Sequence, residues 1–292
     1  MTEHVAADLS CSAAVVVHLV DGTYELFRHF YGRRSGGRRD SQPLGAAAGV
    51  LHTVLQLLES GATHVGVATD HIIESFRNDL WPGYKTGAGV DLALRAQFVP
   101  LEEALASMGV VVWPMVELEA DDALAAAARI AGADDAVRQV CIWTPDKDLA
   151  QCVRGDQVVQ VDRRSNSVRN ADGVLAKFGV DPVRIPDLLA LVGDAADGYP
   201  GIPGIGKVTA ARLVQRHGGL EEFPREVLGD RRDLALLFKD IATLRSSAAL
   251  FGDVDELRWR GPTTAFAGWA ERLGDARLLG RSRALADQAP RA

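Results

Sequence analysis

The sequence predicts an α/β protein in which a doubly wound parallel sheet is followed by a helical region. Short, valine-rich apolar runs alternate with longer segments whose apolar residues recur at helical spacing. Most of these runs end at Asp, Gly or Pro, as buried parallel strands do. Beyond about residue 172 only the helical spacing remains, broken by Gly and Pro turns. We therefore expect an α/β domain over residues 13–180 and a helical region over residues 181–280.

Four strands are expected, at residues 13–20, 65–68, 110–113 and 140–143. Between them, apolar residues at helical spacing indicate helices over residues 51–58, 94–108 and 120–132. Because a strand–helix–strand unit places its two strands parallel, this order implies a sheet with helices on both faces. The end of the chain, residues 281–292, is expected to be a disordered tail.

The bulk composition is that of an ordinary globular protein, with 292 residues of which 47% are hydrophobic and 24% charged. No apolar run approaches the roughly 18 residues that cross a membrane, and the first residues lack the layout of a signal peptide. We therefore expect a cytoplasmic protein. The three cysteines, Cys11, Cys141 and Cys152, are too few and too scattered for a disulfide framework or a zinc site.

Acidic residues follow each expected strand, at the sheet edge where open α/β proteins bind ligands. Asp194 and Asp197 come later, three residues apart, a spacing that places both on one face of a helical turn. Taken singly, each acid is explained at least as well as a helix cap or a solvated turn residue. The full set is Asp21, Asp70, Glu119, Asp121, Asp122, Asp146, Asp148, Asp194 and Asp197.

So many carboxylates at one edge would repel one another unless cations lay between them. Ligands that are all oxygen atoms favour Mg²⁺ or Mn²⁺ over zinc, and two such ions about 4 Å apart catalyse phosphoryl transfer. The net charge of −7 does not exclude nucleic acid, because with nine of the 39 acidic side chains committed to cations the 32 basic ones are in slight excess. These patterns predict a phosphodiesterase or phosphatase and leave DNA, RNA and small phosphate esters open.

Five stretches stand out together: LVDGTYELFRHFY, FRNDLWPGYK, VELEADDALA, WTPDKDLAQCV and LVGDAADGYPGIPGIGKVTAARLVQRHG. They resemble, in the same order, the 5′-nuclease family, which comprises the 5′→3′ exonuclease domain of bacterial DNA polymerase I and the flap endonucleases. The resemblance runs from residue 15 to about residue 220, and five ordered motifs over that length are a specific signal. It implies a PIN-like α/β domain followed by a helix–two-turn–helix DNA-binding motif.

The resemblance also implies roles for individual residues. All nine acids match the family's active-site carboxylates, which share two neighbouring metal positions. Arg77 and Lys85 match the basic pair of an FRxxxxPxYK stretch at the base of a helical arch, where Lys85 would contact the scissile phosphate. Arg28 matches an arginine that touches DNA near the site, and Tyr84 would either stack on a terminal base or serve in packing.

Residues 201–217 resemble the helix–two-turn–helix itself. Gly204 and Gly206 would let the backbone approach a DNA phosphate, and the start of the next helix would aim N–H groups at it. The resemblance further implies a K⁺ ion held here by backbone carbonyls. The residues expected to contact DNA in this motif are Gly204, Ile205, Gly206, Lys207 and Thr209.

The chain departs from the family pattern in three places. The family reads GxGxKTA, whereas this chain reads GIGKVTA, so that Lys207 stands one position early. TGAGVD follows Lys85 where the family often carries another arginine. The arch region, residues 85–97, is short and holds a single arginine, Arg95. These departures bear on the choice between flap and exonuclease substrates and leave the metal chemistry unaffected.

The expected function is that of a metal-dependent, structure-specific 5′-nuclease, a 5′→3′ exonuclease or flap endonuclease, in primer or flap removal and DNA repair. Its partners would be branched, nicked or flapped DNA and RNA–DNA primers, with no membrane. No polymerase-like segment follows the resemblance, so a stand-alone bacterial member is expected. A monomer is expected because no long apolar stripe is left over for a partner. Two alternatives remain: a non-catalytic structure-specific DNA-binding protein, against which the complete acid set argues, and a PIN-type ribonuclease, against which residues 201–217 argue.

Overall fold

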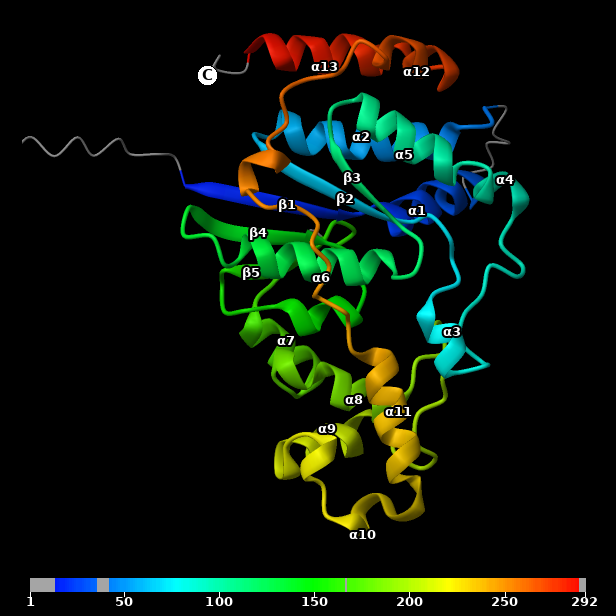
Figure 1. Cartoon of the computed structure of the whole chain (residues 1–292), viewed down its shortest axis with the longest axis vertical. Coiled ribbons are helices and arrows are strands. Elements are labelled where there is room, and N and C mark those ends of the chain that lie inside the picture. The colour runs from blue at the N-terminus through cyan, green and yellow to red at the C-terminus, as the bar shows by residue number, and fades with distance from the viewer. Residues whose placement is uncertain (1–13, 36–41, 166, 289–292) are drawn as a thin grey trace, which may run out of the picture.

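The computed structural model describes residues 14–35, 42–165 and 167–288 and centres on a six-stranded sheet (Figure 1). The strand order is β3-β2-β1-β4-β5-β6. β1 to β5 pair in parallel, and β6 runs antiparallel to β5 at the edge. The strands are β1 (Val15–Asp21), β2 (His64–Asp70), β3 (Val111–Met115), β4 (Val137–Trp143), β5 (Val158–Asp162) and β6 (Ser167–Arg169). The predicted α/β fold is confirmed, with an antiparallel edge strand added to the parallel sheet.

The sequence analysis missed β5 and β6. The five residues of β5 read VVQVD, so Gln160 interrupts an apolar run that is already short. β6 has three residues, which read SVR and carry no periodic signal. Both strands are defined by their pairing, β5 with β4 and β6 with β5, and pairing across the sheet leaves no mark within such short segments.

Helices cover both faces of the sheet. α1 (Gly22–Ser35), α2 (Gly45–Glu59) and α5 (Phe98–Ser107) share one core, in which Leu51, Leu55 and Leu101 are buried. α6 (Ala120–Ala131) packs on the other face, where its alanines allow a close approach to β1 and β4. The expected doubly wound arrangement is therefore present.

Two short helices occupy the connection from β2 to α5. α3 (Phe76–Leu80) begins at a capping box formed by Ser75 and Asn78, and α4 (Leu92–Arg95) begins at Asp91. The single helix expected over residues 94–108 is instead split at Gln97. The buried Gln97 side chain accepts hydrogen bonds from two backbone N–H groups at the start of α2, which satisfies donors that α2 itself leaves unpaired.

A helical region follows the sheet and lies below it in Figure 1. It contains α7 (Ala171–Phe178), α8 (Ile185–Val192), α9 (Lys207–His217), α10 (Arg225–Leu228) and α11 (Arg232–Ala242). α8 and α11 pack together around Leu189, Tyr199 and Phe238. Short 3₁₀ helices occupy Asp148–Cys152, Pro182–Arg184, Leu220–Glu222, Gly229–Arg231 and Val254–Leu257. The switch to a helical pattern near residue 172 is thus reproduced.

The last part of the chain returns to the sheet. After α11 it runs past α6 to α12 (Phe266–Arg272) and α13 (Ala276–Gln288), which lie on the opposite side of the sheet from α8 and α9 (Figure 1). Phe266 and Leu278 belong to the same core as α2 and α5. This differs from the expectation that residues 181–280 form one helical region and 281–292 a disordered tail: residues 281–288 are helical, and 289–292 lie outside the described residues. Over the described ranges, no helix has the length and apolar character needed to span a bilayer.

Candidate functional site

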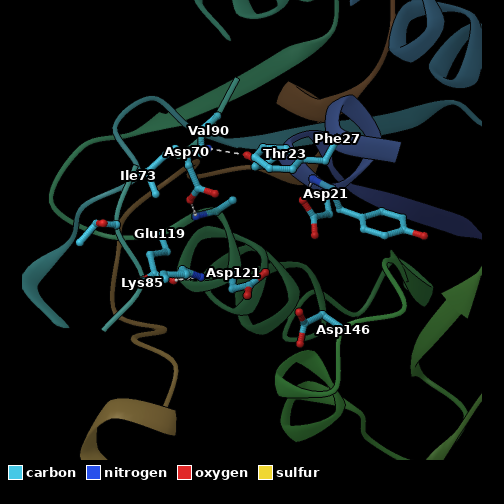
Figure 2. Close-up of a pocket in the computed structure, with 13 residues that line it drawn as sticks. Asp21, Thr23, Phe27, Asp70, Ile73, Lys85, Val90, Glu119, Asp121 and Asp146 are labelled. Atoms are coloured by element: carbon cyan, nitrogen blue, oxygen red, sulfur yellow. Dashed lines mark hydrogen bonds and ion pairs between the residues drawn. The ribbon is translucent and has the colours of Figure 1, made fainter. Parts of the chain in front are cut away.

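The carboxyl ends of the strands bring five of the nine predicted acids to one cavity. Asp21 and Asp70 are the last residues of β1 and β2, Asp146 follows β4, and Glu119 and Asp121 stand at the start of α6 after β3. All five line a cavity of about 360 Å³. Figure 2 shows these carboxylates arriving from separate elements around the same space.

Hydrogen bonds hold the Asp21 and Asp70 carboxylates in place. Asp21 accepts from the backbone N–H of Tyr24 at 2.8 Å and from Thr144 Oγ1 at 3.0 Å. Asp70 Oδ1 accepts from the backbone N–H of Ala120, at the start of α6, at 2.7 Å. Both acids are therefore oriented at the cavity wall by the fold itself.

Asp121 is held differently, because among the described residues no hydrogen bond or ion pair reaches its carboxylate. Burial, and then the charges of Asp146 and Asp21, raise the pKa of Asp121 well above its usual value. Burial also raises the pKa of Asp21 to about 7, and the charge of Asp70 adds to the shift. A cavity that penalises its own ionised carboxylates is one that gains from receiving positive charge.

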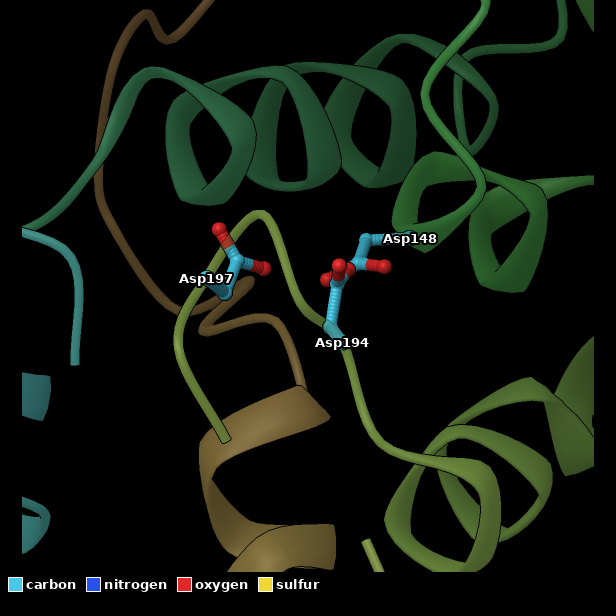
Figure 3. Close-up of side chains that lie close together, drawn as sticks. All are labelled: Asp148, Asp194 and Asp197. Atoms are coloured by element: carbon cyan, nitrogen blue, oxygen red, sulfur yellow. The ribbon is translucent and has the colours of Figure 1, made fainter. Parts of the chain in front are cut away.

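Asp148, Asp194 and Asp197 form a second acidic group, with ligand oxygens within 4.8 Å of one another (Figure 3). Asp148 Oδ1 is buried and accepts no hydrogen bond from any residue that the structure describes. Burial, and then the charges of the neighbouring aspartates, raise the pKa of Asp148 well above its usual value. The expected helical placement of Asp194 and Asp197 is wrong: α8 ends at Val192, and both lie on a tight turn closed by backbone hydrogen bonds between Asp194 and Tyr199.

The turn that carries Asp197 is pressed against the loop that carries Lys85. Gly198 has a φ of +84°, and a Cβ at this position would lie 2.0 Å from the carbonyl oxygen of Gly83. The backbone N–H of Lys85 donates to the carbonyl oxygen of Asp197 at 2.9 Å. Only glycine permits this approach, and the approach sets Asp197 beside Lys85.

Lys85 links the two acidic groups. Its Nζ lies 3.0 Å from Glu119 Oε2 and 3.0 Å from Asp197 Oδ1. Although burial opposes its charge, these two carboxylates raise the pKa of Lys85 well above its usual value. Its side chain is 31% exposed and lines the first cavity, so the ammonium is placed to reach a ligand bound there.

Arg77 and Asp122 face each other in the core and do not line the cavity. Arg77 is 1% exposed, and its guanidinium donates two hydrogen bonds to Asp122, at 2.7 and 2.8 Å. The fully buried Asp122 also accepts from the backbone N–H groups of Glu119 and Arg245. Neither side chain lines the cavity, so the predicted roles of Arg77 in catalysis and Asp122 in metal binding gain no support from these positions and stay predictions. The pair fixes the start of α6, and with it Glu119 and Asp121.

Tyr84 and Arg28 were both expected near DNA. Tyr84 is 4% exposed, its hydroxyl donates to Glu119 Oε2 at 3.2 Å, and its ring belongs to the core of the helical region. Of the two roles open to Tyr84 in the sequence, packing is therefore the one that its position supports. Arg28 pairs with Glu25 on α1 and is 32% exposed at its side chain. Contact between Arg28 and DNA stays a prediction.

The glycine-rich turn expected to contact DNA lies at the surface. Gly206 is the N-cap of α9, and Gly204 has a φ of +84°. No atom of the described part of the chain lies within 4 Å of a Cβ built at either glycine, so the backbone of the turn is open to a ligand. Lys207 and Thr209 are exposed and Ile205 is half-buried. The arrangement suits the predicted contacts with a DNA backbone, which stay predictions.

Lys147 is a residue of the site that the sequence analysis missed. Its Nζ forms an ion pair with Asp194 Oδ2 in the second acidic group. Burial opposes its charge, but the hydrogen bond to Asp194 and the charge of Asp148 raise the pKa of Lys147. The available signal was its position in WTPDKDLAQCV, directly between Asp146 and Asp148.

Both acidic groups have the donor chemistry of a divalent-cation site. Every candidate ligand atom is a carboxylate oxygen, which is the donor that hard cations such as Mg²⁺ and Mn²⁺ prefer. The buried and unpartnered Asp148 Oδ1 offers lone pairs that the protein does not use.

In EDTA, the folded protein is expected to lose stability as the pH rises. The pKa of Asp21 in the folded protein is about 7, above its usual value of 3.8, so its contribution to stability falls between about pH 4 and pH 7. We expect a higher melting temperature at pH 5.5 than at pH 8. At pH 8, Mg²⁺ at 100 times its Kd should restore about 2.7 kcal/mol, because cations bind the ionised carboxylates. Equal melting temperatures in EDTA at both pH values would contradict this account.

The fold and the site together suit one class of protein, because metal-dependent phosphoesterases use carboxylates at the strand ends of an α/β sheet with a basic side chain beside them. Comparison with protein families makes the assignment narrower. The family model described as 5′-3′ exonuclease, N-terminal resolvase-like domain, matches residues 16–179. The model described as 5′-3′ exonuclease, C-terminal SAM fold, matches residues 180–265. The chain belongs to the 5′-3′ exonuclease family.

Individual relatives agree with this assignment. DNA polymerase I of Pseudomonas aeruginosa is 33% identical over 259 residues, which cover 82% of this chain and 28% of that protein. A 5′-3′ exonuclease of Buchnera aphidicola subsp. Baizongia pistaciae is 33% identical over 205 residues, covering 70% of this chain and 67% of that protein. This chain spans between 25% and 30% of the length of the DNA polymerase I relatives that it matches.

Solved structures share the fold. The T5 D15 protein co-crystallized with metal ions matches with a TM-score of 0.66 and 17% identity, over 93% of this chain and 98% of that one. The catalytic core of Rad2 in complex with DNA substrate matches with a TM-score of 0.62 and 16% identity, over 96% of this chain and 93% of that one.

Proposed function

We propose that this protein is a divalent-metal-dependent 5′-nuclease that hydrolyses phosphodiester bonds near the 5′ ends of branched, nicked or flapped DNA. The observation that carries the proposal is the pair of acidic groups, one at the strand ends and one formed by Asp148, Asp194 and Asp197, joined by Lys85. Family membership supports the reaction class. Removal of primers and flaps in replication and repair is the role that such an activity serves, with RNA–DNA primers among its substrates and a monomer as the working unit.

The residues of the site would have different roles in this reaction. Bound Mg²⁺ or Mn²⁺ would activate the attacking water and stabilise the leaving oxygen. The carboxylates that would hold cations are those of the first cavity, namely Asp21, Asp70, Glu119, Asp121 and Asp146, and those of the second group, Asp148, Asp194 and Asp197. Lys85 would place its ammonium against the scissile phosphate and stabilise the charge that develops there.

The surface turn at Gly204 to Gly206 would hold the duplex. Its open backbone and the free N–H groups at the start of α9 suit a DNA phosphate, with Ile205, Lys207 and Thr209 around it. Backbone contacts of this kind position DNA without reading its sequence. A K⁺ ion bound to carbonyl oxygens of the turn would add to this grip, and Arg28 would contact the strand nearer the acids.

The test is cleavage of a 5′-labelled flap duplex, a nicked duplex and a hairpin, each with Mg²⁺, Mn²⁺ or EDTA. We expect cleavage with either metal and none in EDTA. A short oligonucleotide released from the flap would show the endonuclease mode, and mononucleotides from the nick the exonuclease mode. Tight binding without cleavage under any metal would overturn the proposal in favour of a non-catalytic DNA-binding protein. Preferred cleavage of single-stranded RNA would favour a PIN-type ribonuclease instead.

A further inference from the structure

A second cavity lies between the acidic groups and the helix–two-turn–helix. It measures about 440 Å³ and lies where the end of α7, the helix α8 and the start of α9 meet. Its wall includes Lys147, Lys177 and Lys207. The chain contains only five lysines among its 32 basic side chains, and three of the five line this one cavity. Most of the few lysines of this chain therefore lie around one cavity.

The described residues leave two of the three lysines in this cavity without an ion pair. Lys147 pairs with Asp194, but across the described residues no carboxylate lies within ion-pair distance of Lys177 or Lys207. Burial, and then the charge of Arg169, lower the pKa of Lys177, and Lys207 adds a smaller effect in the same direction, while the charges of Asp162 and Asp146 oppose the shift. Asp194 also lines the cavity and pairs with Lys147, so the excess positive charge comes from Lys177 and Lys207, and this excess indicates an anionic ligand.

One of these lysines, Lys207, stands one position earlier than the lysine of the family motif. Lys207 is the first residue of α9 and lines the cavity. Position 208, where the motif has its lysine, carries Val208, which is 66% exposed and stands outside the cavity wall. One residue along an α-helix is a rotation of about 100°. Moving the lysine back by one position therefore turns its charge from open solvent into the cavity.

We propose that this cavity binds one sugar–phosphate unit of the DNA strand that runs between the helix–two-turn–helix and the acidic groups. The phosphate would lie among the ammonium groups of Lys147, Lys177 and Lys207, near the N-terminus of α9. The apolar floor, which includes Leu188 and Val192, suits the carbon face of a deoxyribose.

Lys147 connects the cavity to the candidate cation site. It lines the cavity and also pairs with Asp194, so the two sites share a wall. A strand held by its phosphate in the cavity would therefore be directed towards the second acidic group. The inference rests on the proposed DNA substrate but not on cleavage, and it is tested by binding.

The first experiment measures binding of a fluorescent flap duplex by anisotropy in Ca²⁺, with the DNA verified as intact after each titration. Compared are the natural protein, Lys177→Gln, Lys207→Gln and the double variant. Because both lysines hold one phosphate, we expect each single change to weaken binding roughly tenfold and the double to lose little more. In these variants, the slope of the logarithm of the association constant against the logarithm of the salt concentration should become shallower by about 0.9, which is the value for one phosphate contact.

The second experiment identifies the phosphate. Uncharged methylphosphonates are placed at one position of the strand at a time, and each duplex is made with a 5′-phosphate or a 5′-hydroxyl end. We expect the natural protein to bind more weakly when the methylphosphonate stands at one internal position. The affinity of Lys177→Gln/Lys207→Gln should not change when the methylphosphonate stands at that position. If binding depended only on the 5′-phosphate, the proposal of an internal sugar–phosphate unit would be overturned, and the ligand of the cavity would be a strand end.

Arg272→Gln/Arg283→Gln is the matched control, because both arginines are exposed on α12 and α13, across the sheet from the cavity. An equal change of slope in this control would overturn the inference, since charge loss anywhere would then suffice. So would a double lysine variant that remains sensitive to the same methylphosphonate. Binding results as expected from a protein that never cleaves would instead contradict the proposed nuclease and leave the phosphate site standing.

Discussion

Replacing Asp121 by asparagine is expected to abolish metal-dependent cleavage while leaving the fold intact. Asparagine keeps the size of the side chain but removes the charge of the one cavity carboxylate that no described residue contacts by hydrogen bond or ion pair. A cation between Asp121 and its neighbours would then face a neutral amide in place of a charged carboxylate ligand. We expect kcat to fall by at least about 10²-fold, measured as single-turnover cleavage of flap DNA in Mg²⁺.

The same substitution is expected to stabilise the protein in EDTA. Burial and the charges of Asp146 and Asp21 disfavour the ionised Asp121 side chain in the folded state, and asparagine removes that penalty. Asp121→Asn should therefore have a higher melting temperature than the natural protein in EDTA and gain less from added Mg²⁺. A change that stabilises the fold and removes activity is what a residue kept for function produces.

Asp172→Asn is the matched control for this prediction. Asp172 is also an aspartate in the first turn of a helix, α7, but it is exposed and belongs to neither acidic group. We expect its cleavage rate to match that of the natural protein. Turnover retained by Asp121→Asn at the rate of this control would contradict the assignment of the first cavity to cations.

The acids at the strand ends show how much of the site can be predicted from the sequence. Parallel strands all present their carboxyl ends to the same edge, so Asp21, Asp70 and Asp146 could be placed together once the strands were recognised. The pairing order of the strands was not needed for that inference. The short β5 and β6 were missed, and their absence from the prediction did not disturb the site, because none of the predicted acids lies on them.

What the sequence did not reveal is the direction in which each acid points. Asp121 and Asp122 are neighbours in a motif and look equivalent, but successive residues on a helix point about 100° apart. Asp121 therefore lines the cavity, whereas Asp122 faces the core. The core position of Arg77 depends on the carbonyl oxygen of Ile241, far away in the sequence, to which its Nε donates at 2.8 Å. Contacts of that range leave no local pattern.

Replacing Arg77 by methionine is expected to destabilise the fold much more than it impairs the chemistry of the folded molecules. The substitution leaves Asp122 fully buried without the guanidinium that compensates its charge. Removing one partner of a buried ion pair typically costs about 3–5 kcal/mol. Urea unfolding should show a loss of that size, with the cleavage rate per folded molecule changed far less than in Asp121→Asn.

A double variant separates this positioning role from direct contact with DNA. In Arg77→Met/Asp122→Asn the buried charge is gone, while the asparagine carbonyl still accepts from one of the two backbone N–H groups, which bond to different oxygens of Asp122. We expect the double variant to recover part of the stability that Arg77→Met loses, because a neutral side chain costs less to bury than an unpaired carboxylate. If Arg77 bound a phosphate instead, Arg77→Met would keep the stability of the natural protein but lose cleavage. Adding Asp122→Asn would then not restore cleavage. The bidentate contact at full burial is the reason to expect the first outcome: a guanidinium already committed to Asp122 has no free edge to offer a substrate.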